Sequence, residues 1–469
     1  CYAYHPEPYG PWSTSRKIPM PANAEWQKGR VKPDAVEVAD FDQDGILDIA
    51  VAVESIFMQL CAPTADGYQP NPVKTRPMLA YLGGGQTFND TPLYESACAP
   101  EFKYELLAME AGDFDGDTHP DLVIATDRQG KVGSGKVVNL DILKGNARFG
   151  WCDYDWCPAP MQTDEKGQFA PWGGFVTIPK PTAVGVGKFD GEDSLDDLVV
   201  AFQGTGNPDI PSYVPDSVQA FLSFWSGVSD CGSSDMPSFP GCLPEHSCSG
   251  FCDEANSDAQ CQPNDQISAP VTGLDPVDLA IGHIDNDGVP DAVVANSGSD
   301  NLTLLWGTRV PEGFLLSSPE KPAQLVSVGS KPSYVALGDI DGDGWSDLVT
   351  VLADTLAVSW GVNGTNFSLP TYIGLTLDGS PINPSMAVVT DMNDDDLADI
   401  AVLSNKNSIL YLYLSVGNKQ LQGPFLLFHT GDKPVDMELA DLNQDGCTDI
   451  VIASQGSKSV SVSINELCQ

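Results

Sequence analysis

Residues 338–351 read GDIDGDGWSDLVTV, and this stretch decides the fold. Its aspartates occupy positions 1, 3, 5 and 9 of a short loop, and a glycine occupies position 6. The alternating run KPSYVALG precedes the loop at 331–338, and the β-branched run LVTV follows it. Alternation and β-branched residues predict a strand on each side. Glycine at position 6 permits the left-handed backbone of a sharp turn.

The same loop recurs seven times along the chain. Its copies occupy residues 40–48, 113–121, 188–197, 283–291, 339–347, 391–399 and 441–449. Their first positions are separated by 73, 75, 95, 56, 52 and 50 residues, so the period is near 50 and the earlier copies carry insertions. Such a repeat predicts equivalent units that stack, because one unit alone cannot bury both of its apolar faces.

Each unit holds four runs with strand character, which is typical of a propeller blade. We therefore predict an all-β chain, folded as a seven-bladed β-propeller with four-stranded antiparallel blades over residues 31–469. The last copy ends after its third run, near Ile464. The segment 1–30 contains KIPMP at 17–21, which resembles the fourth run of other copies. We predict that this segment completes the seventh blade and closes the ring.

The acidic loop positions predict calcium binding. Alternate residues of a tight turn can point inward together, and Ca²⁺ accepts six to eight oxygen ligands in flexible geometry. Position 7 would add its backbone carbonyl, and about five to seven ions are expected in all. The predicted ligands are Asp40, Asp42, Asp44, Ile46, Asp48, Asp113, Asp115, Asp117, His119, Asp121, Asp285, Asp287, Val289, Asp291, Asp339, Asp341, Asp343, Trp345, Asp347, Asp391, Asn393, Asp395, Leu397, Asp399, Asp441, Asn443, Asp445, Cys447 and Asp449.

Copy three departs most from this pattern. Lys188 stands at position 1, and the following strand is displaced by one residue. The remaining ligands are Asp190, Glu192 and Asp196 without a gap, whereas a bulge would put Asp193 and Asp197 at positions 5 and 9. We expect weak calcium binding or none at this copy.

Copy four begins with His283, which is a poor calcium ligand. Copy six has Asp396 where glycine is usual, and aspartate enters the left-handed region more readily than most residues. For every copy the alternative is an Asp-rich turn that caps a hairpin without any metal.

These residues resemble the FG-GAP/VCBS repeat family. The resemblance is carried by DFDGD at 113–117, DIDGDG at 339–344 and Gly-to-Phe segments such as 361–367, and it covers residues 31–469. The family includes the integrin α-subunit head, fungal lectins and propeller-type polysaccharide lyases. The resemblance implies a calcium-stabilised propeller whose loops pin strands and do no chemistry.

The net charge of −42, from 65 acidic and 23 basic residues, argues against nucleic acid as a partner, because phosphate binding needs Lys and Arg. It argues equally against docking on an anionic membrane surface.

The twelve cysteines predict disulfides in an oxidising compartment, with Cys61–Cys98 and Cys152–Cys157 as expected pairs. Cys1 has two interpretations. It could carry lipid, as the first residue of a mature bacterial lipoprotein does, or it could pair with Cys468. Either way we expect an extracytoplasmic protein, secreted or held at the cell surface, and a membrane contact only through lipid on Cys1.

Insertions are predicted at residues 55–78, 127–175 and 203–274, the last of them rich in cysteine. Loops on a rigid scaffold often carry binding sites. The candidate contacts to a sugar or protein are the aromatic residues Trp151, Tyr154, Trp156 and Trp172. The alternative is that these side chains merely cover a blade.

No catalytic motif such as GxSxG or HExxH occurs in the sequence. The leading hypothesis is therefore a non-catalytic binding or scaffold module in a cell-surface assembly, with a protein or glycan partner. The alternatives are a lectin, and a polysaccharide lyase or hydrolase. The high acidity disfavours an anionic substrate for the last of these.

Overall fold

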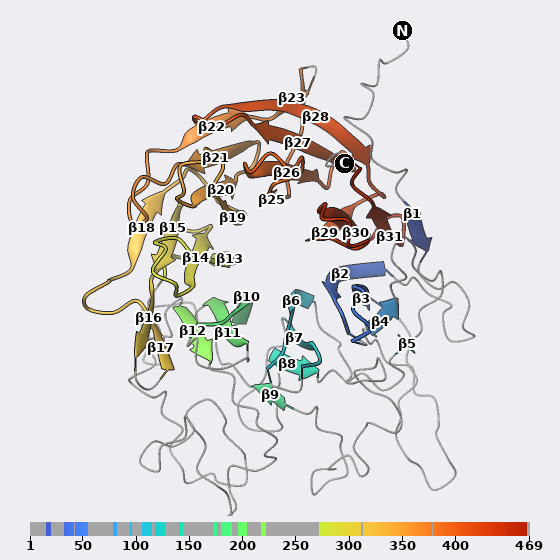
Figure 1. Ribbon diagram of the computed structural model, residues 1–469, viewed down its shortest axis with the longest axis horizontal. Coiled ribbons are helices and arrows are strands. Elements are labelled where there is room, and N and C mark those ends of the chain that lie inside the picture. The colour runs from blue at the N-terminus through green and yellow to red at the C-terminus, as the bar shows by residue number, and fades with distance from the viewer. Residues whose placement is uncertain are drawn as a thin grey trace, which may run out of the picture.

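The computed structural model describes the strands and most of the loops that carry the repeat (Figure 1). The described residues are 16–19, 32–41, 43–54, 78–81, 94–95, 106–114, 118–126, 140–143, 173–175, 180–189, 196–203, 217–221, 272–310, 313–377 and 379–466. Within these ranges the chain forms strands β1 to β31 and no helix, and the strands pair in antiparallel sheets. The prediction of an all-β chain is confirmed.

The strands assemble into successive sheets along the chain. The first three sheets are β2 (Lys32–Ala39), β3 (Asp48–Glu54), β4 (Met78–Tyr81) and β5 (Tyr94–Glu95); β6 (Leu106–Gly112), β7 (Asp121–Thr126), β8 (Leu140–Leu143) and β9 (Gly173–Phe175); and β10 (Lys180–Gly187), β11 (Asp197–Gln203) and β12 (Ser217–Phe221).

The next three sheets follow the same order. They are β13 (Pro276–Gly282), β14 (Asp291–Asn296), β15 (Asn301–Leu305) and β18 (Gln324–Ser327); β19 (Tyr334–Gly338), β20 (Asp347–Val351), β21 (Thr355–Ser359) and β22 (Thr371–Gly374); and β25 (Met386–Thr390), β26 (Asp399–Ser404), β27 (Ile409–Ser415) and β28 (Leu421–His429). Two short hairpins stand outside them, β16 (Gly307–Val310) with β17 (Gly313–Leu316) and β23 (Thr376–Leu377) with β24 (Ser380–Pro381).

The last sheet joins the two ends of the chain. It holds β29 (Pro434–Ala440), β30 (Asp449–Ser454), β31 (Ser459–Ser463) and β1 (Arg16–Pro19). Ile18 of β1 lies opposite Val460 of β31, in antiparallel register. The fully buried Ile18 side chain belongs to the same core as Val460 and Val462.

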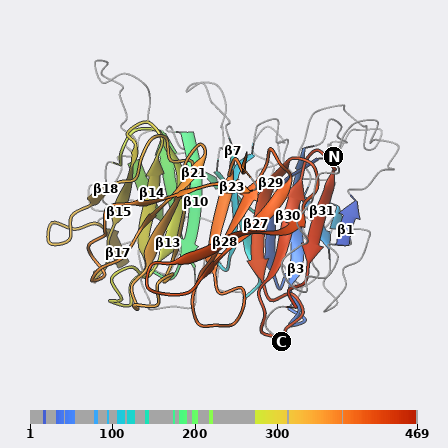
Figure 2. The same ribbon diagram turned by 90° about the horizontal axis from the view of Figure 1, so that it is seen from above.

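The sheets are arranged around a common centre, with β2, β6, β10, β13, β19, β25 and β29 innermost (Figure 1). Figure 2 shows the sheets standing side by side with their strands along a common direction. Apolar cores fill the space between each sheet and the next. One more core lies between the last sheet and the first, where Val451 packs with Val36 and Ile49. This is a propeller-like arrangement.

In every one of these sheets the acidic loop joins the first strand to the second, and the second strand begins at loop position 9. The second strands β14, β26 and β30 are buried at every residue because a neighbouring sheet covers each face. This burial explains why the run after each loop is almost wholly apolar.

Two predicted insertions are too wide. Strands β8 and β9 lie inside 127–175, and β12 lies inside 203–274. Strands β8 and β9 complete the four-stranded second sheet, and β12 is the third strand of the third sheet, for which three strands are described. Only the segments between these strands are additions to the repeat. The sequence did not separate them because the strands are short and the added segments around them are long.

Candidate calcium loops

The described loops share one backbone conformation. Position 6 has a positive φ in each of them, at Gly45, Thr118, Gly288, Gly344, Asp396 and Gly446. Position 4 has a positive φ as well, at Gln43, Asn286, Gly342, Asp394 and Gln444. Two left-handed residues in close succession curl the chain on itself, so the predicted tight turn is present. Asp396 adopts the conformation expected of it without glycine.

The aspartate at position 9 fastens each loop to its sheet. One of its oxygens accepts the backbone N–H of position 2 in all seven copies; Ile340 N lies 2.9 Å from Asp347 Oδ2. In the last four copies the other oxygen accepts an N–H from the last residue of the third strand or from just beyond it, as it does from Gly361 N at 2.7 Å from Asp347 Oδ1. Burial raises the pKa of Asp347 to about 7, against these hydrogen bonds. Position 9 is therefore a buried structural residue as well as a candidate ligand.

The acids at positions 1 and 5 shape the turn. An oxygen of position 1 accepts the N–H of position 6, with Gly344 N 2.8 Å from Asp339 Oδ2. The corresponding bond recurs in copies one, two, six and seven. Position 5 accepts the N–H of position 7, as Asp343 does from Trp345 at 3.0 Å. These bonds leave each carboxylate with lone pairs that can bind a cation.

In copy five, three carboxylates come close together. One oxygen each from Asp339, Asp341 and Asp347 lies within 4.8 Å of the other two. Three carboxylates at this separation repel one another unless a cation lies between them. Hard carboxylate oxygens of this number suit Ca²⁺, which takes the rest of its ligands from carbonyls and water.

In two further loops a buried side-chain oxygen atom has no hydrogen-bond partner. Asp40 Oδ1 at position 1 of copy one, and Asn393 Oδ1 at position 3 of copy six, are buried without a hydrogen-bond partner. A buried oxygen without a partner costs free energy, which a metal ion would recover. The donor set of these loops therefore fits calcium.

In copies six and seven an asparagine replaces the aspartate at position 3. Its amide donates to the position-5 carboxylate, over 3.1 Å from Asn393 to Asp395 and 3.0 Å from Asn443 to Asp445. The amide carbonyl remains an oxygen ligand while the amide nitrogen reduces the repulsion. These loops thus keep the predicted donor pattern with one charge fewer.

Neighbouring loops are linked from position 4 to position 6. Gln43 donates to Thr118 Oγ1 at 2.6 Å, and Asn286 donates to the Gly344 carbonyl at 2.9 Å. Gln444 of the last loop donates to the Gly45 carbonyl of the first. Sequence reasoning missed these links because each one joins two separate copies of the repeat.

Copy three follows the bulged register. Asp197 accepts the Phe189 N–H at 2.9 Å and so occupies position 9, whereas the ungapped register assigned that position to Asp196. Asp196 instead accepts the backbone N–H of Asp113 in the preceding loop, also at 2.9 Å. Of the two registers that the sequence allowed, the bulged one with Asp197 at position 9 is therefore present. The loop of copy three is one residue longer than the others. The hydrogen bond from Phe189 to Asp197 nevertheless places the first residue of the second strand at position 9, as in the other copies.

Copy four carries a basic side chain that the sequence analysis did not consider. Lys321 Nζ lies 2.8 Å from Asp287 Oδ2 and also contacts Asp285 Oδ2. Although partial burial opposes it, the hydrogen bond from Lys321 lowers the pKa of Asp287. At position 1 only the backbone carbonyl of His283 has a described contact, from the Ser346 hydroxyl at 3.0 Å.

A second group of acids lines the centre of the ring. It consists of Glu37, Glu110, Asp278, Asp436 and Glu438, all on innermost strands. Burial, followed by the charges of Asp436 and Asp278, raises the pKa of Glu110 to about 8. Among the described residues, no ion pair joins these acids to a basic side chain. Their signal in the sequence is an acid within the alternating run before a loop, as in KPVDMELA at 433–440.

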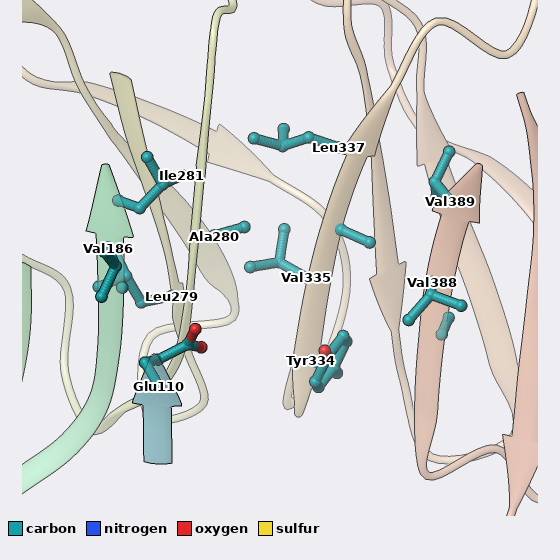
Figure 3. A pocket seen from close by; sticks show the side chains of 13 residues that line it. Glu110, Val186, Leu279, Ala280, Ile281, Tyr334, Val335, Leu337, Val388 and Val389 are labelled. Carbon is teal, nitrogen blue, oxygen red and sulfur yellow. The ribbon is translucent and has the colours of Figure 1, made fainter. Parts of the chain in front are cut away.

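Glu110 also lines a cavity of about 320 Å³ at the centre. Figure 3 shows Glu110 and Tyr334 among apolar side chains such as Leu279, Val335 and Val388. Burial and the charges of the same acids raise the pKa of Tyr334. Two polar groups therefore face a largely apolar wall, and no described base offsets the carboxylate.

Several predicted residues lie outside the described part of the chain. They are Cys1, Asp42, Asp115, Asp117, Trp151, Tyr154, Trp156, Trp172, Asp190 and Glu192. The predicted disulfides Cys61–Cys98, Cys152–Cys157 and Cys1–Cys468 lie outside it too. Cys447, at position 7 of copy seven, is buried and disulfide-bonded, and all the other cysteines lie outside the described ranges. Within those ranges no helix is long and apolar enough to cross a membrane.

The loops and sheets define a class of repeat-built β-protein, and comparison with known families agrees. The model of the FG-GAP-like repeat matches residues 283–350 and 391–452, which span copies four to seven. The chain therefore contains FG-GAP repeats, and the resemblance inferred from the loops is confirmed. No curated protein matches the chain.

Two of the solved structures that resemble the chain show the same complex. They are crystal structures of BBS1N in complex with ARL6DN, one soaked with lead and one with mercury. Their TM-scores are 0.48 and 0.49, and each is 10% identical to this chain over 96% of its length and 97% of theirs.

Proposed function

We propose that the chain is a seven-bladed calcium-binding β-propeller that acts outside the cytoplasm as a non-catalytic binding or scaffold module. The observation that carries the proposal is the convergence of Asp339, Asp341 and Asp347 in a turn whose conformation recurs around the ring. The ring is closed by β1, whose pairing with β31 gives the last sheet its fourth strand.

Calcium in this proposal has a structural role. Each loop joins the first two strands of a sheet. Its position-9 aspartate accepts the backbone N–H of position 2 and, in the last four copies, a second N–H from the end of the third strand or just beyond it. An ion held by positions 1, 3, 5 and 9 would neutralise the carboxylates and fasten one sheet. At a free calcium concentration 100 times the dissociation constant, each occupied loop would stabilise the folded chain by about 2.7 kcal/mol.

The proposed binding role rests on the FG-GAP repeats and on the surface of the outer strands. Three large apolar side chains are exposed on or beside the outer strands of the fourth and fifth sheets: Leu325 on β18, and Leu369 and Tyr372 at β22. Leu369 is 88% exposed. Exposed apolar side chains on a rigid scaffold favour a protein partner. A lectin is the second candidate, supported by the aromatic residues of the 149–175 segment.

Calcium counting tests the metal part of the proposal. The full-length protein, dialysed against trace calcium, is analysed for bound metal and then titrated by calorimetry after removal of calcium with EDTA. Asp343→Asn, which changes the position-5 carboxylate of copy five, should lower the calcium count by one. The matched control is Asp354→Asn, an exposed aspartate in the turn after β20 that belongs to no loop. A wild-type count below about three ions would refute the calcium proposal.

Affinity capture in calcium, followed by mass spectrometry, tests the binding part. A partner that is lost with Leu369→Asp and Tyr372→Asp supports a protein-binding surface on the outer strands. Binding to a glycan array that is lost with Trp151→Ala or Trp156→Ala supports the lectin instead. Turnover of a polysaccharide by the purified protein would refute a non-catalytic role.

A further inference from the structure

Copy four differs from the other described loops at two places that bear on a cation. Its first position is His283, so the loop has no carboxylate there. Its third and fifth positions are Asp285 and Asp287, and both contact the ammonium group of Lys321. One change removes a calcium ligand, and the other places a positive charge against the ligands that remain.

The rest of copy four keeps the geometry of a calcium loop. Asp291 accepts the Ile284 N–H at 2.9 Å and the Gly307 N–H at 2.8 Å, as position 9 does elsewhere. Positions 4 and 6 have the same left-handed backbone as in the other copies. The fold of the turn has therefore been preserved while its charge balance has changed.

Lys321 is held in place by its own surroundings. Its backbone N–H and carbonyl form a reciprocal pair with Ser318, at 3.1 and 3.0 Å. Its ammonium group lies 5.8 Å from the centre of the Trp306 ring, within reach of a cation–π interaction. Arg309 on β16 donates to the Gly288 carbonyl of the same loop at 3.0 Å. The segment that includes the β16–β17 hairpin thus places two basic side chains, Arg309 and Lys321, against the loop of copy four.

We propose that Lys321 is the built-in cation of copy four, so that this loop binds no calcium and its blade is stable without the metal. An ammonium group has three N–H donors and can serve two carboxylates at once. It is attached to the same chain, so its effective concentration at the loop is far above that of a free ion. Calcium would have to displace it from two carboxylates, and it would then lack an oxygen ligand from the side chain at position 1, where His283 stands.

Copy five provides the contrast. Lys419 Nζ lies 3.5 Å from Asp341 Oδ2 and 5.7 Å from the Trp360 ring, but its only ion pair among the described residues is with this one carboxylate. That loop also retains its position-1 aspartate, Asp339. A single, more distant lysine does not balance four acids. Calcium therefore displaces Lys419 from copy five, whereas Lys321 keeps calcium out of copy four.

This inference rests on the proposed calcium function, and two pairs of variants separate the two. Asp287→Asn in copy four should leave the calcium count of the full-length protein unchanged, whereas Asp343→Asn, at the same loop position in copy five, should lower it by one. The double variant His283→Asp/Lys321→Met should gain one calcium. Loss of one ion in Asp287→Asn, or no gain in the double variant, would overturn the role of Lys321.

A metal-free measurement keeps the test independent of calcium. In EDTA, Lys321→Met should lower the melting temperature by about 1–3 °C, because two carboxylates lose their counter-ion. Lys419→Met, which removes one long contact, should change it by less. Equal shifts in the two variants would overturn the inference. If Asp343→Asn leaves the count unchanged while Lys321→Met shows its shift, the calcium function fails and the salt bridge stands.

Discussion

Replacement of Glu110 by glutamine should stabilise the protein, and the gain should grow with pH. Glu110 lies on β6 at the central cavity, next to other acids and without a basic partner among the described residues. Burial and the Asp436 and Asp278 charges raise its pKa from 4.5 to about 8. The folded protein therefore keeps this proton at pH values at which the unfolded chain has released it, and stability falls as the pH rises.

The size of the effect follows from the two pKa values. Below pH 4.5 both states hold the proton, and the carboxyl group costs nothing. Between pH 4.5 and 8 the cost grows, and above pH 8 it is complete. A rise from 4.5 to about 8 corresponds to roughly 5 kcal/mol as an upper limit. Because Glu110 titrates together with the neighbouring acids, we expect about 1–3 kcal/mol at pH 9.

Urea denaturation of wild type and Glu110→Gln at pH 4, 6, 8 and 9 measures this difference, with free calcium held at the same value for both proteins. The difference should be near zero at pH 4 and largest at pH 9. Glu466→Gln is the matched control, because Glu466 is exposed near the end of the chain. A difference that is independent of pH, or a Glu110→Gln protein less stable than wild type at pH 9, would refute the reasoning.

Three further predictions concern the ring and its loops. Ile18→Ala should lower the free energy of unfolding by about 2–5 kcal/mol, because Ile18 is fully buried in the core between the last sheet and the first. Chemical denaturation measures this difference, and a change under about 1 kcal/mol would show that β1 does not close the ring. Asp449→Ala should lower the free energy of unfolding by about 2–5 kcal/mol even in EDTA, since the Leu442 and Asn465 N–H groups lose their acceptor. A loss of stability that appears only with calcium would contradict the structural role of Asp449. EDTA should lower the melting temperature of wild type, and added calcium should restore it, as measured by scanning calorimetry. Equal restoration by magnesium would argue against calcium-selective loops.

The order of the strands could be read from the sequence. The loop chemistry is local, because carboxylates and left-handed residues at fixed spacing make the same turn wherever they occur. The apolar run after each loop predicted a strand buried on both faces, and β14, β26 and β30 are buried throughout. The segment around Ile18 was recognised because a repeat that ends one strand short leaves a position to fill.

The register of copy three and the balance of charge in copy four could not be read in this way. Asp197 rather than Asp196 takes position 9 because a buried carboxylate must meet the Phe189 N–H, and this contact is visible only in the folded chain. Lys321 is 34 residues from Asp287 and belongs to no motif. Its role depends on where the segment after β17 places it.

The sequence by itself determined the turn, the strand pattern and the number of repeats, because these depend on neighbours along the chain. Only the tertiary structure decided which charges meet. Acids from separate sheets, such as Glu110 and Asp436, come together at the centre because each innermost strand turns one face inward. The loops likewise touch through Gln43 and Gln444, across the boundaries between repeats. Contacts between repeats depend on how the sheets pack around the ring, and the sequence pattern within one repeat does not determine that packing.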